Sequence, residues 1–235
     1  MTASGAAALL AAVVGAAAPA RAHSPEPKNA EYAVRWDPAR GTVATPEDAL
    51  AFLGAHGGKP ELYEVRYYDL APPAGSPPDA AVILRRRSGS GGETEIRLKY
   101  RAAHPLADFR CPEVAAFDAK AQLDVGFGAG APSRVYSYSC VTAAAEPPAA
   151  LRAVPKPCAS KMARYETDAP GGGKYKLEVW TLPDGATRLE ISRTAGNSDE
   201  ELEKFKALVA RLRTRGVTPL DVSKTELGSR CPAAN

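Results

Sequence analysis

Histidine is scarce in this sequence, and the motifs of several common enzyme classes are absent. The 235 residues include three histidines, His23, His56 and His104, and none stands at the spacing of a catalytic or metal-binding motif. No glycine-rich phosphate loop is present, and strands and helices do not alternate as in a parallel nucleotide-binding sheet. Histidine-dependent catalysis and a parallel nucleotide-binding fold are therefore not expected.

Positively charged residues are in only small excess over negatively charged ones. The formal net charge is +3, which does not favour nucleic acid as a partner. Apolar residues make up 45% of the chain and charged residues 24%, as in ordinary globular proteins. Beyond the N-terminal region, no apolar run is long enough for a membrane helix, so no membrane partner is expected.

The N-terminal segment resembles a secretory signal peptide. Residues 6–18 form an apolar run too short to span a bilayer, and Ala20-Arg21-Ala22 fits the small-x-small cleavage pattern. The segment before that run carries no Lys or Arg, which departs from the usual signal. We expect a signal peptide over 1–22, a leader over 23–44 and one domain over 45–235, with the mature protein secreted or periplasmic.

The four cysteines lack C-x-x-C spacing, which disfavours a zinc or thioredoxin-like site. An even number in an exported protein predicts two disulfides. Four cysteines allow three pairings, and the sequence does not choose among them. We favour Cys140–Cys158, closing a proline-rich loop, with Cys111–Cys231 holding the C-terminus.

Hydrophobic periodicity predicts an α+β protein built from antiparallel hairpins. A short helix should begin after Thr45, which stands in a capping-box pattern with Asp48 and precedes Pro46. A long helix should begin after Ser198 and end at Gly216. Strands are expected over residues 61–70, 80–87, 94–101, 119–128, 133–141, 174–182 and 186–193, with a short strand over 32–37 within the leader and a proline-rich loop over 143–157.

Cations gather on one face of the central hairpin. In "TEIRLKYR", residues 94–101, Ile96 and Leu98 alternate with Arg97 and Lys99, and the preceding "LRRR" adds further arginines. Like charges on neighbouring strands repel, so an anion would stabilise this face. The simplest alternative is a charged face that only meets solvent.

The order of these segments resembles the CYTH, or triphosphate tunnel metalloenzyme, superfamily. The similar segments are "LYEVRYYD", "LRRR", "EIRLKYR", "SKMARYE", "KLEVWTLPDGATRLEISR" and "SDEELEKFKALVARL". The resemblance implies an antiparallel β-barrel, or tunnel, with flanking helices and a charged interior. Ile96 and Leu98 would then lie on the outer face beneath helices, and Arg97 and Lys99 on the inner one.

The resemblance also implies a set of site residues. The implied phosphate-binding residues are Arg66, Arg85, Arg87, Arg97, Lys99, Lys161 and Arg164. Glu64 and Glu190 would hold Mg²⁺ or Mn²⁺, since hard cations prefer carboxylate oxygens. The chain departs from the pattern where Leu62 and Ser192 replace acidic residues, which leaves the tunnel short of carboxylates.

Three functions follow from these features. The first is a secreted tunnel protein that binds, and with a divalent metal hydrolyses, inorganic tri- or polyphosphate or nucleoside triphosphates. The alternative is a non-catalytic periplasmic or extracellular anion-binding module, which the missing carboxylates favour. The third is a disulfide-braced β domain with no small ligand. No catalytic residue is assigned from the sequence.

Overall fold

The computed structural model describes residues 26–55, 58–168 and 173–233. The strands are β1 (Asn29–Trp36), β2 (Glu61–Asp69), β3 (Ala81–Gly89), β4 (Thr94–Ala102), β5 (Asp118–Phe127), β6 (Ser133–Thr142), β7 (Val154–Pro155), β8 (Ser160–Asp168), β9 (Lys174–Thr181) and β10 (Thr187–Gly196). The helices are α1 (Pro46–Phe52), α2 (Asp199–Thr214) and α3 (Lys224–Gly228), with a 3-10 turn at Ala149–Leu151. The expected signal peptide, 1–22, lies outside the described residues.

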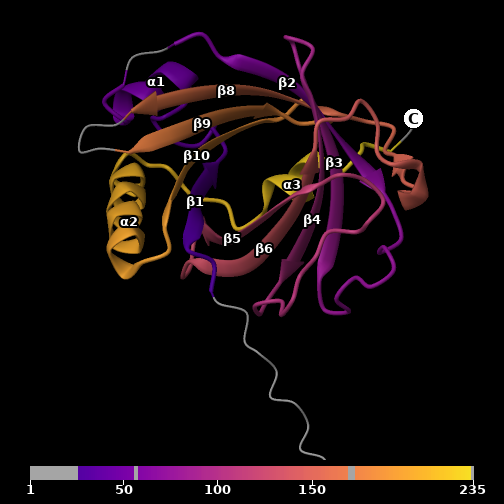
Figure 1. Cartoon of the computed structure of the whole chain (residues 1–235). Helices are drawn as coiled ribbons and strands as arrows, with labels where there is room; N and C mark the ends of the chain where they lie inside the picture. Colours follow the sequence, from indigo (N-terminus) through magenta and orange to yellow (C-terminus); the bar gives the residue numbers. More distant parts are fainter. Residues whose placement is uncertain (1–25, 56–57, 169–172, 234–235) are drawn as a thin grey trace, which may run out of the picture.

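Nine of these strands close into a barrel. Their order is β3-β4-β6-β5-β1-β10-β9-β8-β2, and β2 pairs with β3 to complete the ring, while β7 attaches to one end of β2. Every pair is antiparallel except β1 with β5. The prediction of an α+β fold with an antiparallel barrel and flanking helices is confirmed, with one parallel pair added (Figure 1).

The first strand belongs to a segment that we placed in the leader, residues 23–44. Here β1 pairs with β10 on one side and β5 on the other, so it is an integral part of the wall. The side chains of β1 alternate between the two faces of the wall. Tyr32, Val34 and Trp36 are buried on the outer face, and Glu31 and Arg35 point into the interior. Within the described residues the barrel therefore begins at Asn29.

Alternation along β4 separates a dry outer face from a charged inner face. Ile96, Leu98 and Tyr100 are almost fully buried, whereas Arg97 and Lys99 line the interior. We expected helices to cover these outer side chains, and this expectation is wrong. They pack beneath loops instead, which contribute Leu106, Phe109, Phe117, Ala144 and Leu151. These connections run beside β4 and β6, so loops rather than helices supply the apolar cover there.

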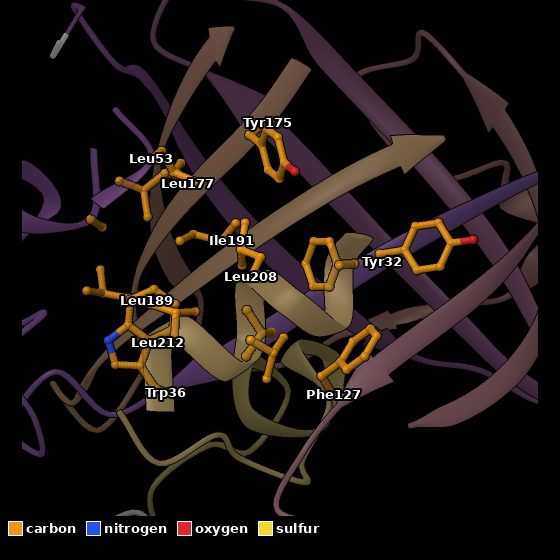
Figure 2. Packing of buried hydrophobic residues seen from close by; sticks show 14 of the residues in the cluster. Tyr32, Trp36, Leu53, Phe127, Tyr175, Leu177, Leu189, Ile191, Leu208 and Leu212 are labelled. Carbon is orange, nitrogen blue, oxygen red and sulfur yellow. The ribbon is translucent and has the colours of Figure 1, made fainter. Parts of the chain in front are cut away.

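Helix α2 covers the other side of the barrel. Its buried stripe of Leu202, Phe205, Leu208, Val209 and Leu212 packs on outward side chains of β1, β5, β9 and β10 (Figure 2). Ser198 caps it through the Glu201 backbone N–H, and Thr45 caps α1 in the capping box expected from the sequence. Among the described residues, no helix has the length and apolar content needed to cross a membrane.

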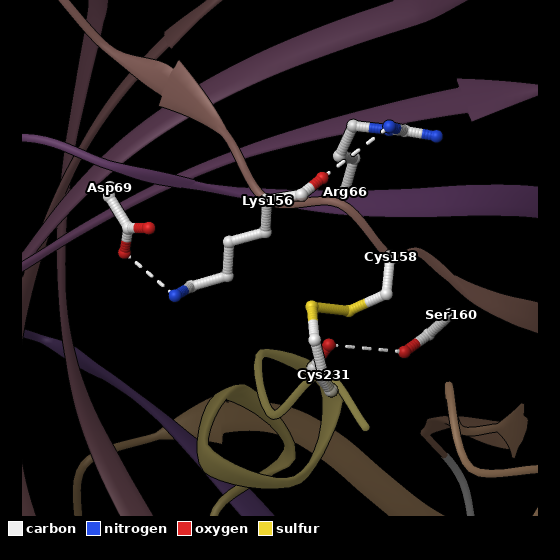
Figure 3. The surroundings of a disulfide bond; sticks show 7 residues. Arg66, Asp69, Lys156, Cys158, Ser160 and Cys231 are labelled. Atoms are coloured by element: carbon white, nitrogen blue, oxygen red, sulfur yellow. Dashed lines mark hydrogen bonds and ion pairs between the residues drawn. A yellow bond between two sulfur atoms is a disulfide. The ribbon is translucent and has the colours of Figure 1, made fainter. Parts of the chain in front are cut away.

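The two disulfides join Cys111 to Cys140 and Cys158 to Cys231, so the pairing that we favoured is wrong. Cys140 lies on the outer face of β6, where it fastens the covering loop to the wall. Cys158 and Cys231 instead tie the C-terminal segment to the chain before β8 (Figure 3). The number of disulfides is confirmed; their pairing depends on contacts between distant segments, which the sequence does not show.

Helix α3 lies at one end of the barrel interior, seen near the centre of Figure 1. Leu227 packs against a buried cluster of Val65, Tyr67, Met162, Trp180 and Leu182. The Ser160 hydroxyl donates to the backbone carbonyl of Gly228 at 3.3 Å. One end of the barrel is therefore apolar and covered, and the charged part of the interior lies beyond it.

Candidate functional site

A cavity of about 210 Å³ occupies the charged part of the barrel interior. Of its fifteen lining residues, nine carry Lys or Arg side chains and two are Glu. The nine are Arg85, Arg87, Arg97, Lys99, Arg101, Lys120, Arg164, Lys176 and Lys224. We refer to this cavity as the tunnel; its walls are predominantly cationic.

Strand register explains why these cations meet. Arg85 of β3 stands opposite Arg97 of β4, and Arg87 stands opposite Glu95. Residues directly opposite each other on antiparallel strands have side chains within contact distance on one face. The two neighbouring strands therefore direct three guanidinium groups at a single carboxylate.

Glu95 is the shared partner of these three arginines. Its carboxylate lies 3.1 Å from Arg97 Nη2, 3.2 Å from Arg87 Nη2 and 3.9 Å from Arg85 Nη2. Burial lowers the pKa of both Arg87 and Arg97, and neighbouring guanidinium groups lower it further. One carboxylate cannot neutralise three cations, so this cluster carries excess positive charge.

Asp124 forms a second shared centre on β5. Its Oδ2 accepts from Lys99 Nζ at 2.8 Å and Arg101 Nη2 at 3.4 Å, and its Oδ1 accepts from Gln122 at 2.7 Å. Burial lowers the pKa of Lys99 to about 8, despite the attraction of Asp124. Burial opposes ionisation of Asp124, but Lys99 and Arg101 outweigh it and lower its pKa to about 2. Here too, two cations share one carboxylate.

The aromatic ring of Tyr63 packs against two cations of the tunnel. The guanidinium carbon of Arg87 lies 4.7 Å from the ring centroid and that of Arg164 lies 5.3 Å from it. Such contacts stabilise guanidinium groups without neutralising them. The ring thus helps to hold both arginines in position.

A third ionic centre lies between the tunnel and its apolar end. Glu178 of β9 and Glu190 of β10 both contact Lys224, at 3.0 and 2.8 Å, and Arg164 and Arg35 flank them. Burial opposes the ionised form of Glu178, but Lys224 and Arg164 outweigh it and hold its pKa well below the usual range. Burial likewise opposes the charge on Lys224, but the two carboxylates raise its pKa.

The structure brings together five of the seven cations expected to bind phosphate. Arg85, Arg87, Arg97, Lys99 and Arg164 all line the tunnel. The other two, Arg66 and Lys161, point away from it, as does one expected metal ligand, Glu64.

Arg66, Lys161 and Glu64 lie on the outer surface of the barrel. Arg66 contacts Glu64 at 3.5 Å, and Glu64 and Lys161 lie in an outer depression. On β2 the inward positions are held by Tyr63 and its alternate neighbours, so the even-numbered residues face outward. Both faces of this strand carry charge, so alternation alone could not identify the inner one.

Several tunnel residues were not assigned to the site from sequence. Glu95 and Arg101 share the alternating face of Arg97 and Lys99, so that pattern could have included them. Glu178 likewise alternates with Lys176 on β9. Lys224 had no such signal, because it lies in a five-residue helix that meets the tunnel only through the tertiary fold.

The carboxylates do not form a site suited to Mg²⁺ or Mn²⁺. The two expected ligands are separated, since Glu64 lies outside the barrel and Glu190 is buried within it against Arg35 and Lys224. Glu95, Asp124 and Glu178 are also bound to cations. Across the described residues, no three Asp, Glu, His or Cys side chains are grouped as metal ligands. A hard divalent cation needs several available oxygen ligands.

Comparison of the sequence with protein-family models and with curated proteins found no match. Solved structures with a similar fold include the PH1819 protein of Pyrococcus horikoshii OT3, 17% identical over 84% of this chain and 97% of that one, with a TM-score of 0.46. PH1012 of the same organism is 19% identical over 84% and 98%, with a TM-score of 0.45.

A third similar structure is HpAC1 from Hippeastrum, assigned as an adenylyl cyclase and described as having a dominant triphosphatase activity. It is 12% identical over 85% of this chain and 97% of that one, with a TM-score of 0.49. These are likenesses of architecture.

Proposed function

We propose that this protein binds a phosphate-rich polyanion, such as inorganic tri- or polyphosphate or a nucleoside triphosphate, inside its barrel. The observation that carries the proposal is the shared use of carboxylates: three arginines converge on Glu95, and Lys99 and Arg101 converge on Asp124. Confined cations of one sign raise the local concentration of a multiply charged anion. A bound polyanion would supply the missing negative charge.

The arrangement of the cations favours a ligand with several linked phosphates. Arg97, Lys99 and Arg101 alternate along β4, at about 7 Å per pair of residues. Guanidinium groups bind phosphate oxygens through two parallel hydrogen bonds, so successive groups can hold successive phosphates. A ligand that extends along the strand would therefore gain more contacts than a single phosphate.

Of the functions expected from the sequence, the contacts favour the anion-binding module over metal-dependent hydrolysis. Glu95, Asp124, Glu178 and Glu190 already neutralise cations, and Glu31 accepts a hydrogen bond from Gln122. The described residues therefore offer no group of ligands for Mg²⁺ or Mn²⁺. We therefore assign no catalytic step to a metal. Two disulfides support the proposal that the protein works in an oxidising compartment, outside the cell or in a periplasm.

Calorimetric titration with tripolyphosphate tests the proposal. Arg97→Ala should weaken binding by about tenfold or more, because a charge-assisted hydrogen bond contributes roughly 1.5–3 kcal/mol. Arg66→Ala and Lys161→Ala remove the same charge from the outer surface and should change affinity less than about twofold. A parallel assay of phosphate release, with and without Mg²⁺ or Mn²⁺, measures hydrolysis.

Two results would contradict the binding site. One is a wild-type protein that does not bind tripolyphosphate at all. The other is an equal loss of affinity in the inner and outer variants, which would show attraction to overall charge. Release of phosphate that requires a divalent ion would instead favour the metal-dependent hydrolase.

A further inference from the structure

Two buried carboxylates lie side by side on the inner face of the barrel wall. Glu178 and Glu190 are register partners on β9 and β10, and their exposed fractions are 2% and 1%. Like charges directly opposite each other on neighbouring strands repel, and buried charges need a partner. The pair therefore requires a cation between its members.

Lys224 supplies that cation from α3, which lies at one end of the barrel interior. Its Nζ lies 3.0 Å from Glu178 Oε2 and 2.8 Å from Glu190 Oε1, so a single ammonium group bridges the two carboxylates. The ammonium also lies 6.0 Å from the centroid of the Trp180 ring. A cation that bridges two carboxylates occupies the position that a divalent metal takes in many carboxylate sites.

The remaining oxygens of the pair are occupied as well. Glu178 Oε1 accepts from Arg164 Nη2 at 2.9 Å, and Glu178 Oε2 also accepts from the Trp180 indole N–H at 3.1 Å. Glu190 Oε2 is ion-paired with Arg35. Each of the four carboxylate oxygens thus lies against a cationic side chain of the protein, which disfavours a metal ion at the same place.

The position of Lys224 is fixed by the segment that carries it. The Ser223 hydroxyl caps α3 by accepting from the Glu226 backbone N–H, and Leu227 packs in the apolar end of the barrel. Seven residues after the lysine, Cys231 is joined to Cys158 (Figure 3). A covalent bond thus holds the C-terminal segment in the position that places the ammonium.

We propose that Lys224 is a resident cation that takes the place of a divalent metal between Glu178 and Glu190, so that the tunnel binds its polyanion without a metal ion. The choice of ligand rests on the proposed function. The bridging of the two carboxylates by Lys224 does not rest on the proposed function. Direct measurements of metal binding test this bridging role separately. Removing the ammonium should convert the carboxylate pair into a divalent-cation site.

The metal arm of the experiment uses Mn²⁺, followed by electron paramagnetic resonance and by calorimetry. The wild-type protein and the outer-surface control Lys161→Met should show no site for Mn²⁺ at micromolar concentrations. Lys224→Met should gain one site per chain, at least tenfold tighter than any residual binding to the wild type. Lys224→Met combined with Glu178→Gln should lose that site.

The ligand arm uses the wild-type protein alone, so the measurement can be made even if Lys224→Met does not fold. Tripolyphosphate affinity should be the same within twofold in EDTA and in Mn²⁺, once the complex of Mn²⁺ with free tripolyphosphate is subtracted. Absence of tripolyphosphate binding under both conditions would count against the proposed function. The Mn²⁺ measurements would still decide the role of Lys224.

Three outcomes would overturn the role given to Lys224. The first is a wild-type Mn²⁺ site that Glu178→Gln removes. The second is tripolyphosphate binding that becomes tenfold or more tighter with Mn²⁺. The third is a Lys224→Met protein whose circular dichroism is native and which binds no Mn²⁺.

Discussion

In the tunnel, a single carboxylate pairs with two or three cationic side chains. Glu95 has three arginine partners, and Asp124 has one lysine and one arginine. Each carboxylate orients its cations but leaves part of their charge available. Because the same network sets both stability and ligand binding, substitutions at the carboxylates and at the cations should have opposite effects on affinity.

Lys99 should make tripolyphosphate binding depend on pH. Its pKa of about 8, lowered mainly by burial, means that raising the pH from 7 to 9 removes the charge in the free protein. The anion binds the charged form, so affinity should fall over this range. Lys99→Met should bind about tenfold more weakly at pH 7, because a charge-assisted hydrogen bond is lost, and should show a flatter pH profile. Titrations at several pH values measure both effects.

The pH profile of Lys161→Met provides the control, since that lysine lies on the outer surface. It should match the wild type in affinity and in slope. A Lys99→Met protein that keeps the full wild-type pH dependence would show that another group is responsible.

Glu95→Gln should change stability and affinity in opposite directions. The substitution leaves three arginines without their carboxylate, and loss of one partner from a buried ion pair costs roughly 3 kcal/mol. The unliganded variant should therefore unfold at lower urea concentration. Tripolyphosphate should bind more tightly, because it no longer competes with Glu95 for the arginines. Urea titrations with and without ligand measure both changes.

Glu64→Gln removes a carboxylate from the outer surface and should leave both quantities nearly unchanged. If Glu95→Gln instead weakened tripolyphosphate binding, Glu95 would act by positioning the arginines more than by neutralising them.

At the scale of elements, the position of α3 depends on one disulfide. Replacing Cys158 and Cys231 together by Ser removes a cross-link between residues 73 apart in sequence, which should lower the free energy of unfolding by about 2–4 kcal/mol. Hydrogen exchange should accelerate in residues 223–233, because α3 is then held only by non-covalent contacts. Exchange measured by mass spectrometry follows this segment directly.

Replacing Cys111 and Cys140 by Ser is the matched control. That pair should also lower stability, but its faster exchange should appear in the loop beside β4 and leave α3 protected. Equal protection of α3 in both double variants would mean that Cys158–Cys231 does not hold it.

Most elements were predictable because their patterns are local. Capping by Thr45 and Ser198 and the alternation in β4 are each decided within a few residues. β8 was not assigned as a strand, since its inward residues mix Ser160 and Met162 with Arg164 and show no clean alternation. The disulfide pairing and α3 depend on contacts between segments far apart in sequence.

The candidate site was predictable in part for a similar reason. Alternation separates the two faces of each strand, and on β4 the apolar residues identify the outer one. On β2 both faces mix polar and apolar side chains, so Glu64 and Arg66 could not be placed by pattern. Ion pairing is also invisible in sequence, which is why the engagement of Glu190 with Arg35 and Lys224 emerged only from the fold.

At the scale of the whole molecule, the distribution of charged side chains affects anion binding more than the net charge does. The chain carries a formal net charge of +3, yet nine cations line one cavity of about 210 Å³. Charges on the outer surface are screened over about 10 Å at 0.1 M salt, whereas those in a confined, partly buried space are screened less. The affinity for an anion should therefore rise with the number of negative charges that the anion carries into the tunnel.

Affinity should rise in the order phosphate, pyrophosphate, tripolyphosphate, because each added phosphate reaches further cations along β4 and its neighbours. Each step should tighten binding by about tenfold if it adds one charge-assisted contact. Raising salt from 0.05 to 0.5 M should weaken tripolyphosphate most, since it forms the most ionic contacts. The combined Arg66→Ala and Lys161→Ala protein, with two fewer outer charges, should keep the same order and salt slope. Equal affinities for the three anions would contradict an extended site, because a single phosphate would then satisfy every cation that the tunnel offers.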